Sequence, residues 1–158
     1  MKMEQDDPVF LPVSINITGK KILIIGGGKV GFHKATILNR FTANAFVISP
    51  EFHQGFASLP FTLIKKKYTK GDLENVFLVY ICTEDELLNR QIKEDACELG
   101  VLASVCDNPI LCDFVSPAIF SEGNITISVA SNARDVRRSI AIRDRIAALV
   151  VNEDLSLY

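Results

Sequence analysis

Short apolar runs alternate with polar, helix-forming stretches over the first two thirds of the chain. Five runs rich in Ile, Val, Leu and Phe predict buried strands, at 20–25, 45–49, 61–64, 76–82 and 101–105. Residues 29–40 and 84–99 predict helices, the second with Thr83 as its N-cap. Strands that alternate with helices predict an α/β fold with a parallel sheet and right-handed crossovers.

The pattern changes after about Phe114. Residues 115–120 and 125–129 predict two strands around a turn, and residues 135–151 predict one helix. A segment of this size is small for a core of its own. We therefore expect residues 114–158 to pack on the domain formed by residues 1–113 or to build a dimer.

Composition narrows the class of protein. The chain has 158 residues, of which 48% are hydrophobic and 23% charged, which fits one folded domain and excludes disorder. A net charge of −2 argues against a uniformly basic nucleic-acid binder. The acidic N-terminus lacks a signal-peptide pattern, and no apolar run approaches the length of a membrane span. These features predict a cytoplasmic protein with no nucleic-acid or membrane partner.

The four cysteines, Cys82, Cys97, Cys106 and Cys112, form no C-x-x-C pair. With only two histidines in the chain, they do not make a zinc pattern, so we expect no metal site. In a cytoplasmic protein such cysteines are expected to be reduced and mostly buried.

A glycine motif follows the first predicted strand. Residues 26–31 read GGGKVG, which fits G-x-G-x-x-G between a strand and a helix. Gly26 would permit the tight turn, Gly28 would let the backbone approach a pyrophosphate, and Gly31 would let helix and strand pack closely. The helix N-terminus would attract the phosphates. The alternative is a glycine-rich turn without a ligand, but the context favours a dinucleotide.

The acid that usually ends the second strand of such a motif is missing. Here that strand ends at Ser49, followed by Pro50 and Glu51. Ser49 could bond a ribose or a 2′-phosphate, so these residues leave NAD and NADP open.

Polar residues follow the fourth and fifth predicted strands, where ligands of doubly wound folds lie. Thr83 opens the first group, and residues 104–109 form the second. Asp107 is the candidate base, because a carboxylate near a nicotinamide could remove a proton as a hydride leaves. Asp-Asn-Pro also initiates turns, and the residues alone leave turn and catalysis equally open.

Five of the seven arginines, Arg134, Arg137, Arg138, Arg143 and Arg145, are clustered in or near the last predicted helix. Guanidinium groups bind carboxylates and phosphates. A solvated helix face, with Asp135 and Asp144 as partners, is the alternative.

Together these motifs resemble the precorrin-2 dehydrogenase family, the NAD-dependent part of siroheme synthase. The resemblance covers residues 9–150 and rests on the order and spacing of six stretches: Leu11–Val13, Gly26–Gly31, Ser49–Glu51, Thr83–Asn89, Val105–Pro109 and Leu111–Ala118. It implies a Rossmann-like domain that binds NAD, followed by a small α+β region that forms a homodimer. It also implies oxidation of precorrin-2 to sirohydrochlorin.

The resemblance also assigns residues. Asp107 matches the family's essential aspartate, and Ser131 matches a residue near its active site. The eight carboxylates of precorrin-2 give the arginine cluster a partner. The residues expected to bind NAD are Gly26, Gly28, Lys29, Val30, Gly31, Ser49, Pro50, Glu51 and Thr83. Those expected to bind substrate are Ser131, Arg134, Arg137 and Arg138.

The sequence departs from the family pattern at three places, of which the first two keep a degenerate carrier open and the third is a mild change. Ser104 stands where the family usually has Asn, residues 132–136 replace a Gly-Gly-x-Ser-Pro-like segment, and Gly31 stands where Ala is common. The alternatives are an NAD-binding regulatory module, a degenerate tetrapyrrole carrier, and a bifunctional enzyme that also inserts iron.

Overall fold

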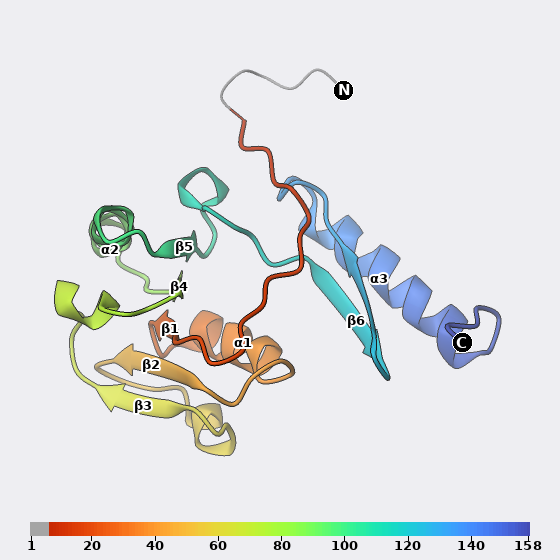
Figure 1. Ribbon diagram of the computed structural model, residues 1–158, viewed down its shortest axis with the longest axis horizontal. Coiled ribbons are helices and arrows are strands. Elements are labelled where there is room, and N and C mark those ends of the chain that lie inside the picture. The colour runs from red at the N-terminus through yellow and green to blue at the C-terminus, as the bar shows by residue number, and fades with distance from the viewer. Residues whose placement is uncertain (1–6) are drawn as a thin grey trace. The chain divides into compact units, whose positions relative to one another are not determined.

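The computed structural model describes residues 7–158 and divides them into two compact units (Figure 1). One unit is residues 14–114, and the other combines residues 7–13 with residues 115–158. Residues 1–6, which make up most of the acidic N-terminus, lie outside the described residues. Within residues 7–158, no helix combines the length and the apolar character that crossing a membrane requires.

The larger unit is a five-stranded parallel sheet in the order β3-β2-β1-β4-β5. Its strands are β1 (Ile22–Ile25), β2 (Ala45–Ser49), β3 (Thr62–Lys65), β4 (Leu78–Ile81) and β5 (Leu102–Val105). The strand order reverses at β1, between β2 and β4. The predicted α/β fold is therefore confirmed, and the carboxyl ends of β1, β4 and β5 share one edge of the sheet.

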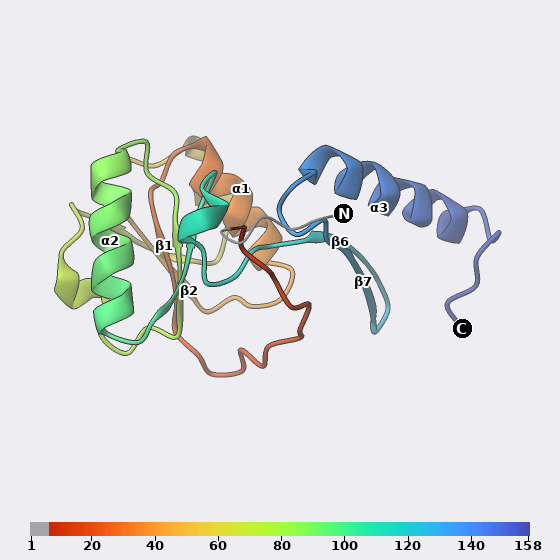
Figure 2. The same ribbon diagram turned by 90° about the horizontal axis from the view of Figure 1, so that it is seen from above.

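Each face of this sheet has its own core, because successive strand residues point to opposite faces. Leu23 of β1 packs in a cluster with Ile92 of α2 (Glu86–Glu98), and Ile24 packs in a second cluster with Ala35 of α1 (Lys29–Leu38). Figure 2 shows the two helices on opposite sides of the strands. The unit is thus covered on both faces, as its continuous apolar strands require.

The second predicted helix, α2, starts later than predicted, because its N-cap is not Thr83. The N-cap of α2 is Asp85, whose side chain accepts hydrogen bonds from the backbone N–H groups of Leu87 and Leu88, each 3.0 Å away. Thr83 lies two residues before the cap and bonds elsewhere. An aspartate is a stronger N-cap than a threonine, which explains the later start.

Three short 3₁₀ helices occur in segments for which we predicted loops or no element. They are η1 (Gln54–Ser58), η2 (Lys70–Leu73) and η3 (Pro109–Leu111). The first follows β2, and the third follows β5 and forms part of the site described below.

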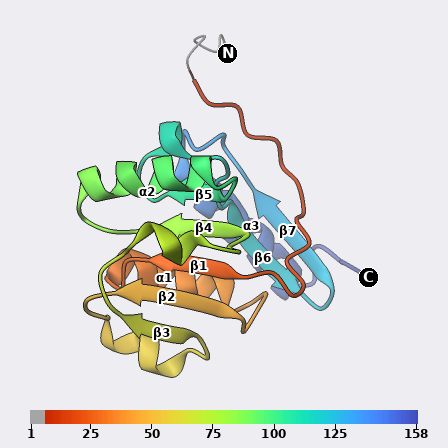
Figure 3. The same cartoon turned by 60° about the vertical axis from the view of Figure 1, so that its left-hand side comes forward.

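The smaller unit is a hairpin and a helix (Figure 3). β6 (Ala118–Glu122) and β7 (Ile125–Val129) are antiparallel, and α3 (Val136–Val151) contacts both strands. The hairpin turn is tighter than predicted, because Gly123 adopts a φ of 56° and the strands extend to either side of a two-residue loop.

Residues 7–13 group with this unit and not with the sheet that follows them. The side chain of Asn132 accepts from the backbone N–H of Phe10 at 2.7 Å and donates to the carbonyl of Pro8 at 2.6 Å. The unit is therefore built from both sides of the larger one along the chain. The division into a cofactor domain at 1–113 and a dimerisation region at 114–158 stays a prediction.

Candidate functional site

The glycine loop turns sharply at the end of β1. Gly26 has a φ of 113°, a conformation that other residues rarely adopt. Its N–H donates to the carbonyl of Ile48 at 2.9 Å, and a Cβ at this position would collide with the carbonyl of Cys82. The tight turn predicted for Gly26 is thus present, and it brings the loop against the end of β4.

The loop opens α1 with its N-terminus uncovered. Gly28 is the N-cap and makes no side-chain cap bond, and a Cβ at Gly28 would meet no atom within 4 Å. At Gly31 a Cβ would collide with the carbonyl of Gly26, so the helix packs closer to the loop than an alanine would allow without a shift. Free N–H groups beside open space fit a pyrophosphate.

The segment after β2 lies against the same loop. A Cβ at Gly27 would collide with the carbonyl of Glu51 and lie 2.9 Å from the Cβ of Ser49, and the N–H of His53 donates to the carbonyl of Gly27 at 2.7 Å. Ser49 is buried, while Pro50 and Glu51 are exposed. The structure therefore places these predicted residues beside the predicted phosphate loop.

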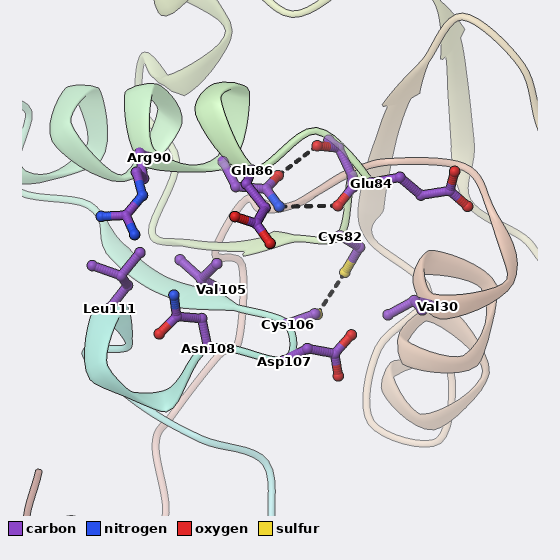
Figure 4. Close-up of a pocket in the computed structure, with 12 residues that line it drawn as sticks. Val30, Cys82, Glu84, Glu86, Arg90, Val105, Cys106, Asp107, Asn108 and Leu111 are labelled. Atoms are coloured by element: carbon purple, nitrogen blue, oxygen red, sulfur yellow. Dashed lines mark hydrogen bonds between the residues drawn. The ribbon is translucent and has the colours of Figure 1, made fainter.

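A pocket of about 390 Å³ lies beyond the carboxyl ends of β4 and β5 (Figure 4). It is open to the start of α1 and lies wholly within the larger unit. Its lining residues are Val30, Cys82, Thr83, Glu84, Glu86, Asn89, Arg90, Val105, Cys106, Asp107, Asn108 and Leu111. Three of the predicted site residues, Val30, Thr83 and Asp107, are thus brought together in one cavity.

Asn89 is a pocket residue that our prediction did not select. It is buried, its amide donates to the carbonyl of Thr83 at 2.9 Å, and its oxygen accepts from the Thr83 hydroxyl. Asn89 therefore fixes the segment between β4 and α2. A buried asparagine one turn into a helix that starts at the sheet edge is the signal that could have identified it.

Asp107 lines this pocket and has a left-handed conformation, with a φ of 69°. The turn is closed by the backbone, since the N–H of Asn108 donates to the carbonyl of Val105 at 3.1 Å. Figure 4 shows the Asp107 carboxylate pointing toward Val30. It has no hydrogen bond or ion pair with residues 7–158, so it does not serve the turn in the way that the alternative required.

Charged groups in the pocket include both signs. Glu84, Glu86 and Asp107 supply carboxylates, and Arg90 supplies a guanidinium. Ser104, one of the departures from the family pattern, is buried and does not line the pocket; its hydroxyl oxygen lies 3.7 Å from the sulfur of Cys112.

The cysteines are less buried than predicted. Only Cys82 is buried, Cys106 and Cys112 are half-buried, and Cys97 is exposed on α2. Burial raises the pKa of Cys112, whose sulfur accepts from the N–H of Val105 at 3.2 Å. Within residues 7–158, no group of three or more His, Cys, Asp or Glu side chains is arranged to hold a metal ion.

The predicted substrate-binding residues lie in the smaller unit. The Ser131 hydroxyl accepts from the N–H of Asp135 at 3.0 Å, and Arg134 pairs with Asp7 at 2.6 Å. Arg137 and Arg138 are exposed in the first turn of α3. These four residues belong to one surface region of that unit, and their role toward a substrate stays a prediction.

The sequence matches a protein family over the larger unit. Residues 13–118 match the family model described as "Putative NAD(P)-binding". Siroheme synthase from Psychrobacter arcticus is 34% identical over 143 residues, covering 88% of this chain and 26% of that protein. Siroheme synthase from Nitrosococcus oceani is 29% identical over 145 residues, covering 89% and 31%. The chain thus spans about a quarter to a third of these curated relatives.

Among solved structures, the chain resembles one named "SirC, precorrin-2 dehydrogenase". The TM-score is 0.75 at 20% sequence identity, and the match covers 88% of this chain and 70% of that one. This likeness shows a shared fold over most of the chain.

Proposed function

This chain belongs to the NAD(P)-binding family whose model matches residues 13–118, and on that basis we propose that it oxidises precorrin-2 to sirohydrochlorin with NAD as hydride acceptor. The names of its relatives support the substrate, since siroheme synthase and precorrin-2 dehydrogenase both act in tetrapyrrole chemistry. The single observation that carries the proposal is the unpaired Asp107 carboxylate in a pocket beside the glycine loop.

Different residues of the chain would bind the cofactor and remove the proton. Gly28 leaves the N-terminus of α1 open to the pyrophosphate, and Ser49 and Glu51 lie where the adenosine ribose would reach. NAD, when bound, supplies the hydride-accepting ring. Asp107 then takes the proton that the macrocycle releases, because its carboxylate lines the pocket and makes no hydrogen bond or ion pair with residues 7–158.

The backbone at Asp107 supports this role. Asp107 has a φ of 69°, a left-handed conformation that few residues other than Gly, Asn and Asp adopt, and such conformations gather at functional sites. The conformation holds the carboxylate out from the turn. An aspartate that only closed a turn would instead bond its own backbone.

The smaller unit would complete the enzyme as a homodimer. Its helix exposes Val136, Ile140 and Val151, and its hairpin has only two strands. An isolated two-stranded sheet is marginally stable, so a second copy would supply the missing apolar contacts. The arginines at the start of α3, Arg134, Arg137 and Arg138, would then meet substrate carboxylates together with Ser131.

An anaerobic assay tests the reaction. Precorrin-2 made enzymatically is mixed with the full chain and NAD, and NADH and the macrocycle spectrum are followed together. We expect equal amounts of NADH and sirohydrochlorin. Asp107→Asn should lower turnover about a hundredfold or more, since that is the usual contribution of a general base. Asparagine tolerates a positive φ, so this variant should fold normally.

Glu94→Gln is the matched control, because Glu94 is an exposed carboxylate of α2 outside the pocket. It should keep full turnover. Equal turnover by Asp107→Asn and the native chain would remove Asp107 from the mechanism. NAD binding without any precorrin-2 oxidation would instead favour the carrier or the regulatory module.

A further inference from the structure

Two thiols meet inside the pocket, and the proposed reaction uses neither. The sulfurs of Cys82 and Cys106 lie 2.8 Å apart, as the dashed line in Figure 4 shows. We propose that these two cysteines form a reversible disulfide when the protein meets a peroxide, and that the disulfide arrests the site at Asp107. The second part rests on the proposed function, while the first stands without it.

Strand register produces this pair. Ile81 of β4 is opposite Val105 of β5, and Cys82 and Cys106 directly follow these two residues at the ends of the strands. Neighbouring strands run about 4.8 Å apart, which lies within the Cα separation that a disulfide needs. The side chains already point to each other, so a bond requires only a small approach of the sulfurs.

The two thiols differ in access and in acidity. Cys106 is half-buried and lines the pocket, whereas Cys82 is buried. A hydrogen bond from Cys82 lowers the pKa of Cys106, and the positive charge of Lys34 on α1 lowers it further. The bond with Cys106, together with burial, raises the pKa of Cys82. Cys106 is therefore the nucleophile, and Cys82 is the resolving thiol.

The chemistry balances with hydrogen peroxide as oxidant. The Cys106 thiolate attacks one peroxide oxygen, so that an S–O bond forms, the O–O bond breaks and hydroxide leaves to become water. The sulfur of Cys82 then attacks the Cys106 sulfur, loses its proton and displaces a second water. The thiol pair gives up two electrons and two protons, and one peroxide becomes two waters.

The bond would act on both halves of the candidate site. Cys106 directly precedes Asp107, whose backbone is left-handed, and the carbonyl of Cys82 lies against Gly26 of the phosphate loop. Drawing the sulfurs to a bonded distance of about 2.05 Å moves the residue that positions the carboxylate. Small displacements of reacting groups cost about a hundredfold in rate, so we expect a loss of that size in the oxidised protein.

Peptide mapping under non-reducing conditions tests the bond without any substrate. After treatment with peroxide, the intact chain should lose two hydrogen atoms. Trypsin leaves Cys82 alone in residues 71–90 and the other three cysteines in residues 94–134, so further cleavage at Glu98 and before Asp107 isolates Cys106. We expect the cross-link to join the peptides that carry Cys82 and Cys106, and dithiothreitol to release it.

Single variants sharpen the assignment. Cys106→Ser should abolish the cross-link, while Cys97→Ser, which changes an exposed cysteine of α2, should keep it. Because Cys82 is buried and its replacement could unfold the chain, Cys106→Ser carries the test. Four free thiols after peroxide, or a cross-link through Cys112, would overturn the proposal.

Turnover gives the second readout. The oxidised native chain should lose activity and recover it with dithiothreitol, whereas the residual activity of Cys106→Ser should not respond to peroxide. A mapped disulfide with undiminished turnover would overturn the arrest. If the reduced chain oxidises no precorrin-2, the proposed function fails, and the mapping still decides whether the bond forms.

Discussion

The two units of this chain are held together in different ways. Of the hydrophobic side chains that are buried among residues 7–158, all but Val150 belong to the parallel-sheet unit. That unit has a core on each face of its sheet, and its site lies at the edge where the strands end. The hairpin and α3 are packed on each other, but their outer apolar side chains are exposed.

Because of this difference, the two units do not depend equally on contacts outside themselves. The sheet unit contains everything required to position the glycine loop and Asp107, because the strands that carry them are internally buried. The smaller unit buries too little apolar surface to be stable by itself. Contact with a second copy would bury more of its apolar surface, and for this reason the proposed dimer contact is placed on this unit.

The largest expected contrast is in core substitutions. Ile24→Ala empties a fully buried position of β1, and it should lower the free energy of unfolding by about 4 kcal/mol. Ile142→Ala changes a side chain of α3 that is 42% exposed, and it should cost less than about 1 kcal/mol at low protein concentration. Urea unfolding followed by circular dichroism measures both. Equal costs would contradict the contrast between the units.

A pair of glycine variants separates stability from binding. Gly26→Ala forces an alanine into a positive φ and against the carbonyl of Cys82, and it should destabilise the sheet unit by about 3 kcal/mol. Gly28→Ala meets no protein atom, so it should unfold like the native chain and yet bind NAD more weakly. Thermal unfolding with and without NAD compares them. An undiminished NAD shift in Gly28→Ala would contradict the phosphate-loop assignment.

The smallest change in intrinsic stability is expected at the surface of α3. Ile140→Arg places a charge on a side chain that is 40% exposed, and it should shift the protein from dimer to monomer in analytical ultracentrifugation. Leu99→Arg changes a side chain of the sheet unit that is 44% exposed, and it should leave the assembly unchanged. A native chain that sediments as a monomer would remove the dimer from the proposal.

The sequence was sufficient for the fold because its strands are continuous apolar runs. The seven strands and three long helices found within residues 7–158 lie where the apolar and polar pattern predicted them, within a few residues. The starting point of α2 was missed, since both Thr83 and Asp85 are good N-caps and only the bonds to Leu87 and Leu88 distinguish them. The 3₁₀ helices were missed because short turns have no periodicity to detect.

The site was predictable only in part. The glycine loop has a local motif, and the structure places it beside Ser49 and Glu51 as that motif requires. The pairing of Cys82 with Cys106 depends on strand neighbours that are distant in sequence, although both residues directly follow their strands. Asn89 required knowledge of its buried bonds to Thr83. Substrate contacts by the arginines depend on partners outside the chain and stay a prediction.

The bonds from Asn132 to Pro8 and Phe10 also bear on the order of events during synthesis. Residues 7–13 are synthesised before the parallel sheet, but Asn132, to which they bond, is made only after the whole sheet has been translated. The sheet can therefore complete its strand pairing before residues 7–13 have their hydrogen-bond partner. We therefore expect the binding of residues 7–13 by Asn132 to be one of the last steps of folding, and to complete the smaller unit.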